Sequence, residues 1–540
     1  MSTNVLPGGP DPDIAAAVAA ASLDAYPDPE ARKARAKLGD VWRIDPRRIL
    51  LAPGASELIY RIARCWVSDG TPVVIAGPTF GEYARAARLH GGRAYEVRAR
   101  RPTLRVDLDE LRSTVARLRP ALVFLCSPNN PTGHAVDVDA IAEFAHSLPA
   151  GTLLVLDESY RTFAEGRLAP PHRPGEDRIL HLRSFTKDLA IPGLRIAAAV
   201  GAPALLETLR RAGPPWAVSA PALAALHAGL EPAVLARLGA RWAELGRGRD
   251  ALTHALTARG WDVLPSQTGF VLARADTAPL VSRRLREAGV RVRDTRSFGL
   301  PDHVRFAAPR SDALPILVEA LDALDVGAPG PDTVQPTARD RLLLVRHGST
   351  DANRAGRFQG WSDPPLADIG VSEVAQASAQ LGPLPASTRV WCSDLTRAVH
   401  TAARLVPDSV IHLDRRLREL SFGAFEGQTH EELSTGPSAE YAAWLADPEA
   451  SPPPGGERLS ELRARLFEWW ADQAHDLSGR TLVVAHGGPL GVLLSELLMD
   501  SDPHRDAVPP PGGFLELQRR SGEVHWHVIH TYQPSVRTEA

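Results

Sequence analysis

The sequence predicts an α/β fold with two domains joined by a linker, and two observations carry this prediction. Short, almost wholly apolar runs each end at a polar side chain, as buried parallel strands do at the edge of a ligand site; these runs are residues 121–126, 152–157, 341–346 and 481–486. Residues 327–340 are rich in Pro and Gly and nearly lack large apolar side chains, which indicates an interdomain linker. We therefore expect domains at residues 1–326 and 341–540.

Lys187 is the most informative single residue of the first domain, because it is one of only three lysines among the 61 lysine and arginine residues. An amine on a flexible stem condenses with an aldehyde and can lose its proton near neutral pH, whereas a guanidinium stays protonated. In a chain whose basic residues are nearly all arginine, this position indicates a chemical need for an amine.

Polar residues upstream of Lys187 suit pyridoxal 5′-phosphate (PLP). Asp157 ends one buried run, where a carboxylate can pair with a pyridinium nitrogen, and Tyr160 and Asn130 can donate hydrogen bonds to the ring oxygen. Residues 53–56 directly precede a helical pattern, whose first amides form an anion site. We expect Ala55 and Ser56 to supply backbone contacts to the cofactor phosphate.

The motifs at residues 127–133, 157–160 and 184–195 together resemble fold-type I PLP enzymes of the aminotransferase superfamily, over about residues 1–325. The resemblance implies a large mixed, mostly parallel sheet at about residues 45–235, and a small α+β domain formed by the N-terminal segment with about residues 236–326. It also implies a homodimer with shared sites. The residue roles it implies are covalent cofactor binding by Lys187, phosphate binding by Ser184 and Arg195, ring stacking by Phe80, a contact from Tyr26 to the cofactor phosphate of the neighbouring subunit, and a substrate-carboxylate clamp by Arg305.

Within that superfamily, residues 78–86, 187–195 and 290–308 resemble threonine-phosphate decarboxylases, which are relatives of histidinol-phosphate aminotransferases. Decarboxylation requires the bond from Cα to the carboxylate to stand perpendicular to the cofactor ring, whereas transamination requires the bond from Cα to hydrogen there. A small rotation of the Arg305 clamp would switch between them, so both reactions stay open. The chain starts almost inside the family's substrate loop, near Asn4, so we expect either that this loop is short or that the true start lies further upstream.

The second domain carries two histidines at strand ends, two arginines and a glutamate. A neutral imidazole such as His347 can attack phosphorus in line, while cationic groups absorb charge on the equatorial oxygens. Arg346, Arg397 and His486 are expected to do the latter, and Glu419 is expected to protonate the departing alkoxide. The set predicts phosphoryl transfer through a phosphohistidine.

These motifs closely resemble the histidine phosphatase superfamily, which includes phosphoglycerate mutases and α-ribazole phosphatase, over residues 341–540. The resemblance implies an α/β/α, phosphoglycerate mutase-like domain. Asn353 and residues 357–366 match its phosphate pocket. No metal is expected, because this chemistry needs none and the sequence has no Cys/His ligand cluster.

The composition limits the partners and the compartment. A net charge of −3 is too near neutral to indicate nucleic-acid binding, and no apolar run reaches the roughly 18–20 residues that span a bilayer. Three scattered cysteines indicate a reducing compartment. We expect a cytoplasmic protein that acts on small phosphorylated molecules.

Two assignments of function compete. In the first, a threonine-phosphate decarboxylase is fused to a phosphatase for α-ribazole phosphate or a cobamide phosphate, which places both activities in cobalamin biosynthesis. In the second, a histidinol-phosphate aminotransferase is fused to a phosphatase acting on its product. A third possibility, that one half is a non-catalytic binding module, is disfavoured because both halves carry complete sets of candidate catalytic residues.

Overall fold

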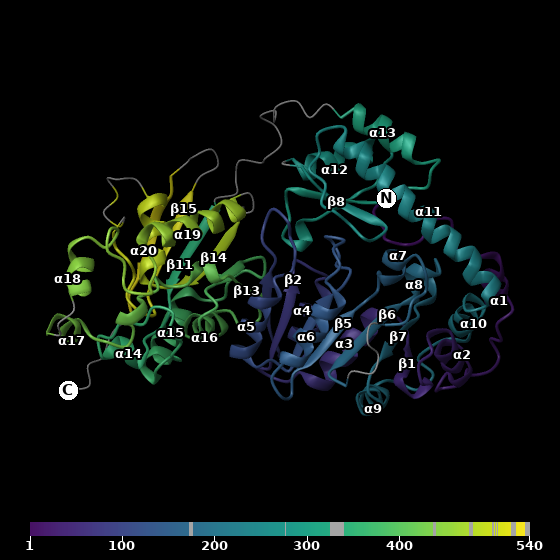
Figure 1. Cartoon of the computed structure of the whole chain (residues 1–540), viewed down its shortest axis with the longest axis horizontal. Helices are drawn as coiled ribbons and strands as arrows, with labels where there is room; N and C mark the ends of the chain where they lie inside the picture. Colours follow the sequence, from purple (N-terminus) through teal and green to yellow (C-terminus); the bar gives the residue numbers. More distant parts are fainter. Residues whose placement is uncertain are drawn as a thin grey trace. The chain divides into compact units, whose positions relative to one another are not determined.

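The chain forms two compact units, Met1–Pro329 and Gly330–Ala540. The computed structural model describes residues 1–171, 177–275, 277–324, 340–435, 439–474, 479–498, 502, 504, 506–519 and 525–534. Each unit alternates helices and strands (Figure 1). The predicted linker at residues 327–340 lies outside the described residues except for Asp340. Asp340 begins strand β11 (Asp340–Arg346), so its assignment to the linker is wrong.

The N-terminal unit is built around a mixed sheet with the strand order β1-β7-β6-β5-β4-β2-β3. Only β7 runs against its neighbours β1 and β6, and the other pairs are parallel, which confirms the predicted mostly parallel sheet. The strands are β1 (Ile49–Ala52), β2 (Pro72–Gly77), β3 (Arg93–Arg98), β4 (Leu122–Cys126), β5 (Leu153–Asp157), β6 (Ile179–Ser184) and β7 (Ala197–Val200).

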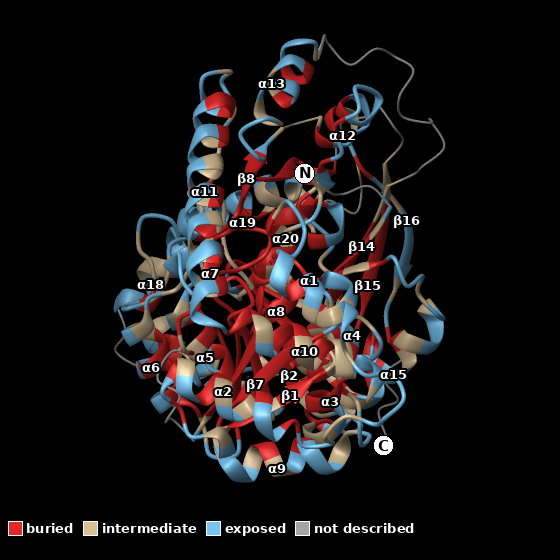
Figure 2. Cartoon of the chain, turned by 90° about the vertical axis from the view of Figure 1, so that its right-hand side faces the viewer, coloured by how far each residue is buried: buried red, intermediate tan, exposed pale blue. Residues whose placement is uncertain are grey.

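Helices cover this sheet, and Figure 2 shows buried residues concentrated in the strands and in the helix faces turned toward them. Several helices begin where the sequence supplies a cap; the carboxylate of Asp107 accepts from two backbone amides at the start of α5, as Asp137 does for α6. The helices of this part are α1 (Pro12–Ala19), α2 (Arg32–Trp42), α3 (Ala55–Trp66), α4 (Glu82–Leu89), α5 (Leu108–Leu118), α6 (Val138–Ser147), α7 (Arg161–Glu165), α8 (Phe185–Asp188), α9 (Pro203–Ala212) and α10 (Ala220–Gly229), with 3₁₀ turns η1 (Pro46–Arg48) and η2 (Pro192–Leu194).

A second, antiparallel sheet in the order β8-β10-β9 lies in the same unit, after the long helix α11 (Pro232–Thr257). Val304 and Phe306 belong to the apolar core around this sheet, and strand alternation therefore turns the intervening Arg305 to the opposite face. The remaining elements are β8 (Phe270–Arg274), α12 (Ala278–Glu287), β9 (Arg293–Asp294), η3 (Arg296–Phe298), β10 (His303–Ala307) and α13 (Leu314–Asp322).

The C-terminal unit contains a sheet in the order β13-β12-β14-β11-β15-β16. The strands from β13 to β11 are mutually parallel, and β15 is antiparallel to both of its neighbours. The carboxyl ends of β11, β12 and β14 therefore meet at one edge. The strands after β11 are β12 (Arg389–Cys392), β13 (Ile411–Leu413), β14 (Arg480–Ala485), β15 (Phe514–Arg519) and β16 (His527–Tyr532).

The helices of the C-terminal unit pack on this sheet around a core that includes Trp469, Leu466 and Leu493. They are α14 (Asp351–Arg354), α15 (Asp368–Leu381), α16 (Thr396–Leu405), α17 (His430–Thr435), α18 (Ala439–Ala446), α19 (Leu459–Ala474) and α20 (Gly487–Leu497), with 3₁₀ turns η4 (Arg415–Leu417) and η5 (Gly423–Phe425). Within the described ranges of both units, no helix has the length and apolar character needed to cross a membrane.

Candidate active sites

Lys187 lies at the carboxyl edge of the large sheet, beside the residues predicted to act with it. The parallel strands β4, β5 and β6 end at Cys126, Asp157 and Ser184, and α8 starts directly after Ser184. The Lys187 Nζ donates to Ser184 Oγ at 3.2 Å and lies 5.1 Å from the centre of the Tyr160 ring. The fold thus brings the amine, the phenol and the strand-end carboxylate to one edge.

The Asp157 carboxylate is held by two donors. Tyr83 donates from its hydroxyl to Oδ2 at 2.7 Å, and the Ser159 amide donates to Oδ1 at 2.9 Å. Burial raises the pKa of Tyr83 well above its ordinary value, so the phenol stays a neutral donor. Sequence reasoning missed Tyr83, although it follows Phe80 by three residues, and the Phe80 ring meets the Tyr83 ring edge-on at 5.8 Å.

The residues predicted to bind the cofactor phosphate meet at the start of α3. Ala55 and Ser56 are its first two residues, and Gly54 before them has a φ of 102°. A Cβ at Gly54 would lie 2.9 Å from Arg195 Nη2, so glycine permits the guanidinium to approach this helix end. Helix amides and an arginine together suit a phosphate group.

Arg305 is buried and already partnered by the chain itself. Its Nη1 donates to Asn130 Oδ1 and its Nη2 to the Ser2 carbonyl at 3.0 Å. Burial lowers the pKa of Arg305 to about 10, which still leaves it charged at neutral pH. Arg293 is its register partner across β9 and β10, so both arginines lie on one face of the small sheet. Arg293 was also missed from the sequence.

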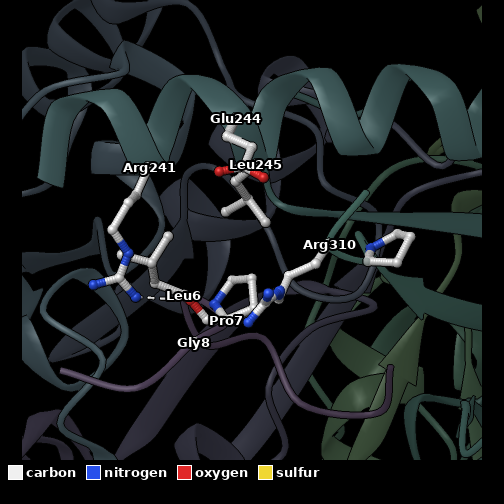
Figure 3. A pocket seen from close by; sticks show the side chains of 8 residues that line it. Leu6, Pro7, Gly8, Arg241, Glu244, Leu245 and Arg310 are labelled. Carbon is white, nitrogen blue, oxygen red and sulfur yellow. Dashed lines mark hydrogen bonds between the residues drawn. The ribbon is translucent and has the colours of Figure 1, made fainter. Parts of the chain in front are cut away.

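The N-terminal segment runs along this site rather than stopping short of it. Asn4 Nδ2 donates to the Tyr160 hydroxyl at 3.3 Å, and the Leu6 amide donates to the Lys187 carbonyl at 3.2 Å. A pocket of about 260 Å³ lies beside this segment. Figure 3 shows its lining side chains, among them Arg241 of α11. Arg241 donates to the carbonyls of Pro7 and Gly9, each at 2.7 Å, and so fixes the segment to that helix.

Tyr26 is the one predicted residue of this group that lies apart. Its side chain is 83% exposed, and its ring contacts Trp216 at 5.1 Å. Among the described residues of one chain, Tyr26 has no recorded contact with Lys187 or Arg195.

In the C-terminal unit, His347 follows β11 and His486 follows β14, and their ring centres are 4.9 Å apart. His347 Nδ1 donates to its neighbour's carbonyl, Gly348 O, at 2.8 Å, and Nε2 accepts from Arg397 Nε at 3.4 Å. This assigns the proton to Nδ1 and the lone pair to Nε2. Burial, together with the charge of Arg397, lowers the pKa of His347 well below its usual value, so the ring is neutral at neutral pH.

Two side-chain nitrogens of this cluster are buried without a partner in the part of the chain that the structure describes: Arg346 Nε, which is a donor, and His486 Nδ1. Burial, and then Arg397, lowers the pKa of His486 well below its usual value, and its Nε2 lies 2.8 Å from Ser393 Oγ. An unmet buried donor costs about 1–3 kcal/mol, which an incoming phosphoryl oxygen would offset.

The side-chain carboxylate of Glu419 contacts the amino end of α20. Its Oε1 accepts from the amides of Gly488 at 3.0 Å and Leu420 at 2.9 Å, and a Cβ at Gly488 would collide with that oxygen. Asn353 Oδ1 accepts from the Thr350 amide at 3.0 Å in the cap of α14, which fixes the turn after the His347 strand. Among the described residues, no group of three or more His, Cys, Asp or Glu is placed to hold a metal ion.

Comparison with known proteins assigns each unit to a family. The model of the family described as aminotransferase class I and II matches residues 1–321, and that of the histidine phosphatase superfamily (branch 1) matches residues 342–529. Histidinol-phosphate aminotransferase 1 of Thiobacillus denitrificans is 32% identical over 340 residues, which cover 61% of this chain and 86% of that protein. The aromatic amino acid aminotransferase of Thermobifida fusca is 32% identical over 321 residues, which cover 56% of this chain and 86% of that protein.

Solved structures resemble the N-terminal unit. Histidinol-phosphate aminotransferase of Sinorhizobium meliloti in complex with PLP has a TM-score of 0.55 and 26% identity, covering 59% of this chain and 88% of that one. L-threonine-O-3-phosphate decarboxylase of Porphyromonas gingivalis has a TM-score of 0.50 and 27% identity, covering 59% and 97%. The family and the donor set around Lys187 assign PLP as the cofactor of this unit. The chain therefore belongs to the aminotransferase class I and II family, and it carries a histidine phosphatase domain after it.

Proposed function

We propose that the N-terminal unit decarboxylates threonine phosphate and that the C-terminal unit is a phosphohistidine-forming phosphatase for α-ribazole phosphate or a cobamide phosphate, so that both serve cobalamin biosynthesis. The observation that carries the first half is the pairing of Arg305 with Arg293 across β10 and β9. Two guanidiniums on one face suit a substrate with two anionic groups, a carboxylate and a phosphate. Histidinol phosphate itself offers only the phosphate, whereas the glutamate that an aminotransferase also binds carries two carboxylates.

The residues of the N-terminal site have separate tasks. When bound, PLP supplies an electron sink for the bond that breaks at the substrate Cα. Asp157, fixed by Tyr83 and Ser159, would hold the proton on the ring nitrogen, and Arg195 with the first amides of α3 would hold the phosphate. Arg305 orients the substrate carboxylate, which requires that the Ser2 carbonyl give up its bond to this guanidinium.

In the C-terminal unit, the described geometry supports in-line attack by His347 Nε2. That nitrogen carries the lone pair, and Arg397 and Arg346 supply positive charge for the phosphoryl oxygens. Glu419 would protonate the departing alkoxide and then take a proton from the water that attacks the phosphohistidine. The first step converts the ester into the alcohol and the phosphohistidine, and the second converts the phosphohistidine and one water into free His347 and phosphate.

The exposed residues Leu23, Tyr26 and Trp216 support a homodimer through the N-terminal unit. These side chains are 86%, 83% and 46% exposed, which is unusual for large apolar groups, and Tyr26 already contacts Trp216. In such a dimer Tyr26 would reach the cofactor phosphate of the neighbouring subunit. We expect sedimentation of the purified chain to give twice the mass of one chain, and a monomer at micromolar concentration would contradict the dimer.

We also propose that the enzyme acts in the cytoplasm.

The test of the decarboxylase offers threonine phosphate and PLP to the full chain without any keto acid. Release of carbon dioxide with formation of a phosphorylated aminopropanol is the expected result. No release, together with amine transfer that depends on 2-oxoglutarate, would overturn the decarboxylase.

Histidinol-phosphate aminotransferase is the second candidate, and the relatives favour it. The proteins of that name from Thiobacillus denitrificans and Moorella thermoacetica are 32% and 30% identical to this chain. In this alternative, the C-terminal unit would hydrolyse histidinol phosphate, which is the product of the transamination. Transfer from glutamate to imidazole-acetol phosphate by the purified chain would support it.

A further inference from the structure

The loop that carries Trp361 is tied directly to the phosphatase machinery. Arg397, whose Nε contacts His347, donates from Nη2 to the Gly360 carbonyl and from Nη1 to the Ser362 carbonyl, each at 2.8 Å. The two acceptors flank Trp361 in the chain. On the other side, the carboxylate of Glu426 accepts from the amides of Trp361 and Ser362, each at 2.8 Å. The backbone of Trp361 is therefore fixed relative to the nucleophile.

The indole of Trp361 is also held in place. Its Nε1 donates to the backbone carbonyl of Glu419 at 2.9 Å, and the guanidinium of Arg418 lies 5.2 Å from the ring centre. Arg418 is itself held by Asp394 through bonds of 2.7 and 2.6 Å. Although it is anchored at its edge and stacked on a cation, Trp361 is 44% exposed.

The indole of Trp361 is exposed although apolar side chains are available near this loop. Phe358, three residues earlier, packs against Phe422 and Trp444 in a cluster of aromatic rings. The loop thus turns one aromatic residue into the core and presents the other at the surface beside Glu419. A rigid aromatic face at such a place can stack on a second ring with little entropy to lose.

We propose that Trp361 is a specificity-determining residue, whose exposed face stacks on a planar aromatic ring in the alcohol part of the phosphate ester. The substrate class is then a phosphomonoester whose leaving alcohol carries an aromatic or heteroaromatic ring two or more bonds from the ester oxygen. A short aliphatic phosphate, such as the product of a small amino acid decarboxylase, would be a poor substrate. The inference rests on the proposed phosphatase function of the C-terminal unit.

The test compares two esters with similar primary-alcohol leaving groups, 2-phenylethyl phosphate and butyl phosphate. The full chain and its Trp361→Ala and Trp361→Phe variants are assayed for kcat/KM on both. Trp361→Phe keeps an aromatic face but loses the hydrogen bond to the Glu419 carbonyl, so it separates stacking from positioning of Glu419. Trp361→Leu replaces Trp361→Ala if the smaller side chain prevents folding.

The proposal expects Trp361→Ala or Trp361→Leu to lower the ratio of kcat/KM for the aromatic over the aliphatic ester by roughly tenfold, and Trp361→Phe to keep most of that ratio. An active variant with an unchanged ratio overturns the proposal. An equal loss on both esters in all variants also overturns it, since Trp361 would then act only on the position of Glu419. If the wild-type chain hydrolyses neither ester, nor any other phosphomonoester, the phosphatase function itself fails and this inference fails with it.

Discussion

Replacement of Arg397 by glutamine removes the positive charge beside His347 and keeps a planar, hydrogen-bonding group in its place. Arg397 is buried and makes three contacts, one to His347 Nε2 at 3.4 Å and two to backbone carbonyls at 2.8 Å. The contact to His347 lies at the atom that we propose receives the phosphoryl group. The variant therefore affects both the charge that receives the phosphoryl oxygens and the protonation of the nucleophile.

Two magnitudes follow. Loss of one preorganised donor to a transition state costs about 10²–10³ in rate, so kcat/KM should fall by that factor. The charge of Arg397 is, after burial, the second cause that lowers the pKa of His347. A unit positive charge 3.4 Å from a protonated imidazole raises the free energy of that imidazole by about 5 kcal/mol at an effective dielectric constant near 20. This value is an upper bound, because the charge of Arg397 is spread over its guanidinium. Without it, the pKa of His347 must rise.

The assay is the pH profile of phosphate-ester hydrolysis. Attack needs the neutral ring, so activity is lost as pH falls through the pKa of His347, and the acid limb of Arg397→Gln should lie at higher pH than that of the wild type. Arg404→Gln is the matched control, because Arg404 lies on the same helix but is exposed. A limb that stays in place or moves to lower pH, or a kcat/KM within about threefold of the wild type, would refute the reasoning.

Three further outcomes are expected. Lys187→Ala should lose the visible absorption band of the PLP-loaded protein, and a band of wild-type intensity would remove Lys187 from the cofactor site. His347→Ala should abolish hydrolysis of phosphate esters while leaving that band intact; turnover that persists would exclude the phosphohistidine. Tyr83→Phe should lower the free energy of unfolding of the N-terminal unit by about 1.5–3 kcal/mol, because the buried Asp157 carboxylate loses a donor, and a urea titration with an unchanged midpoint would contradict this.

The sequence was sufficient to place the residues that act at strand ends. Asp157, His347 and His486 each follow or end an apolar run. In a parallel sheet the carboxyl ends of the strands lie at one edge, so residues at these ends are brought near the same edge of their sheet. Local pattern is enough for these positions. The large mixed sheet was predicted from the family resemblance, whereas the short apolar runs by themselves indicated only buried strands of the parallel type.

The sequence did not reveal contacts that depend on register or on distant segments. Tyr83 meets Asp157 across 74 positions, and its ring stacks on Phe124 of the neighbouring strand β4. Arg293 becomes a candidate site residue only because it pairs with Arg305, and the register of a two-residue strand sets that pairing. Trp361 lies in a segment that matched a phosphate pocket, yet its link to Glu419 spans 58 positions. Tertiary structure alone supplies these relations.

Attachment of the cofactor to Lys187 is the central claim, and reduction of the PLP-loaded chain with borohydride followed by peptide mapping tests it most directly. Lys33, Lys37 and Lys187 are the only lysines of the chain, so the map is unambiguous. The account predicts that the phosphopyridoxyl mass appears on the peptide that contains Lys187. Its appearance on Lys33 or Lys37, or on no peptide, would contradict the account.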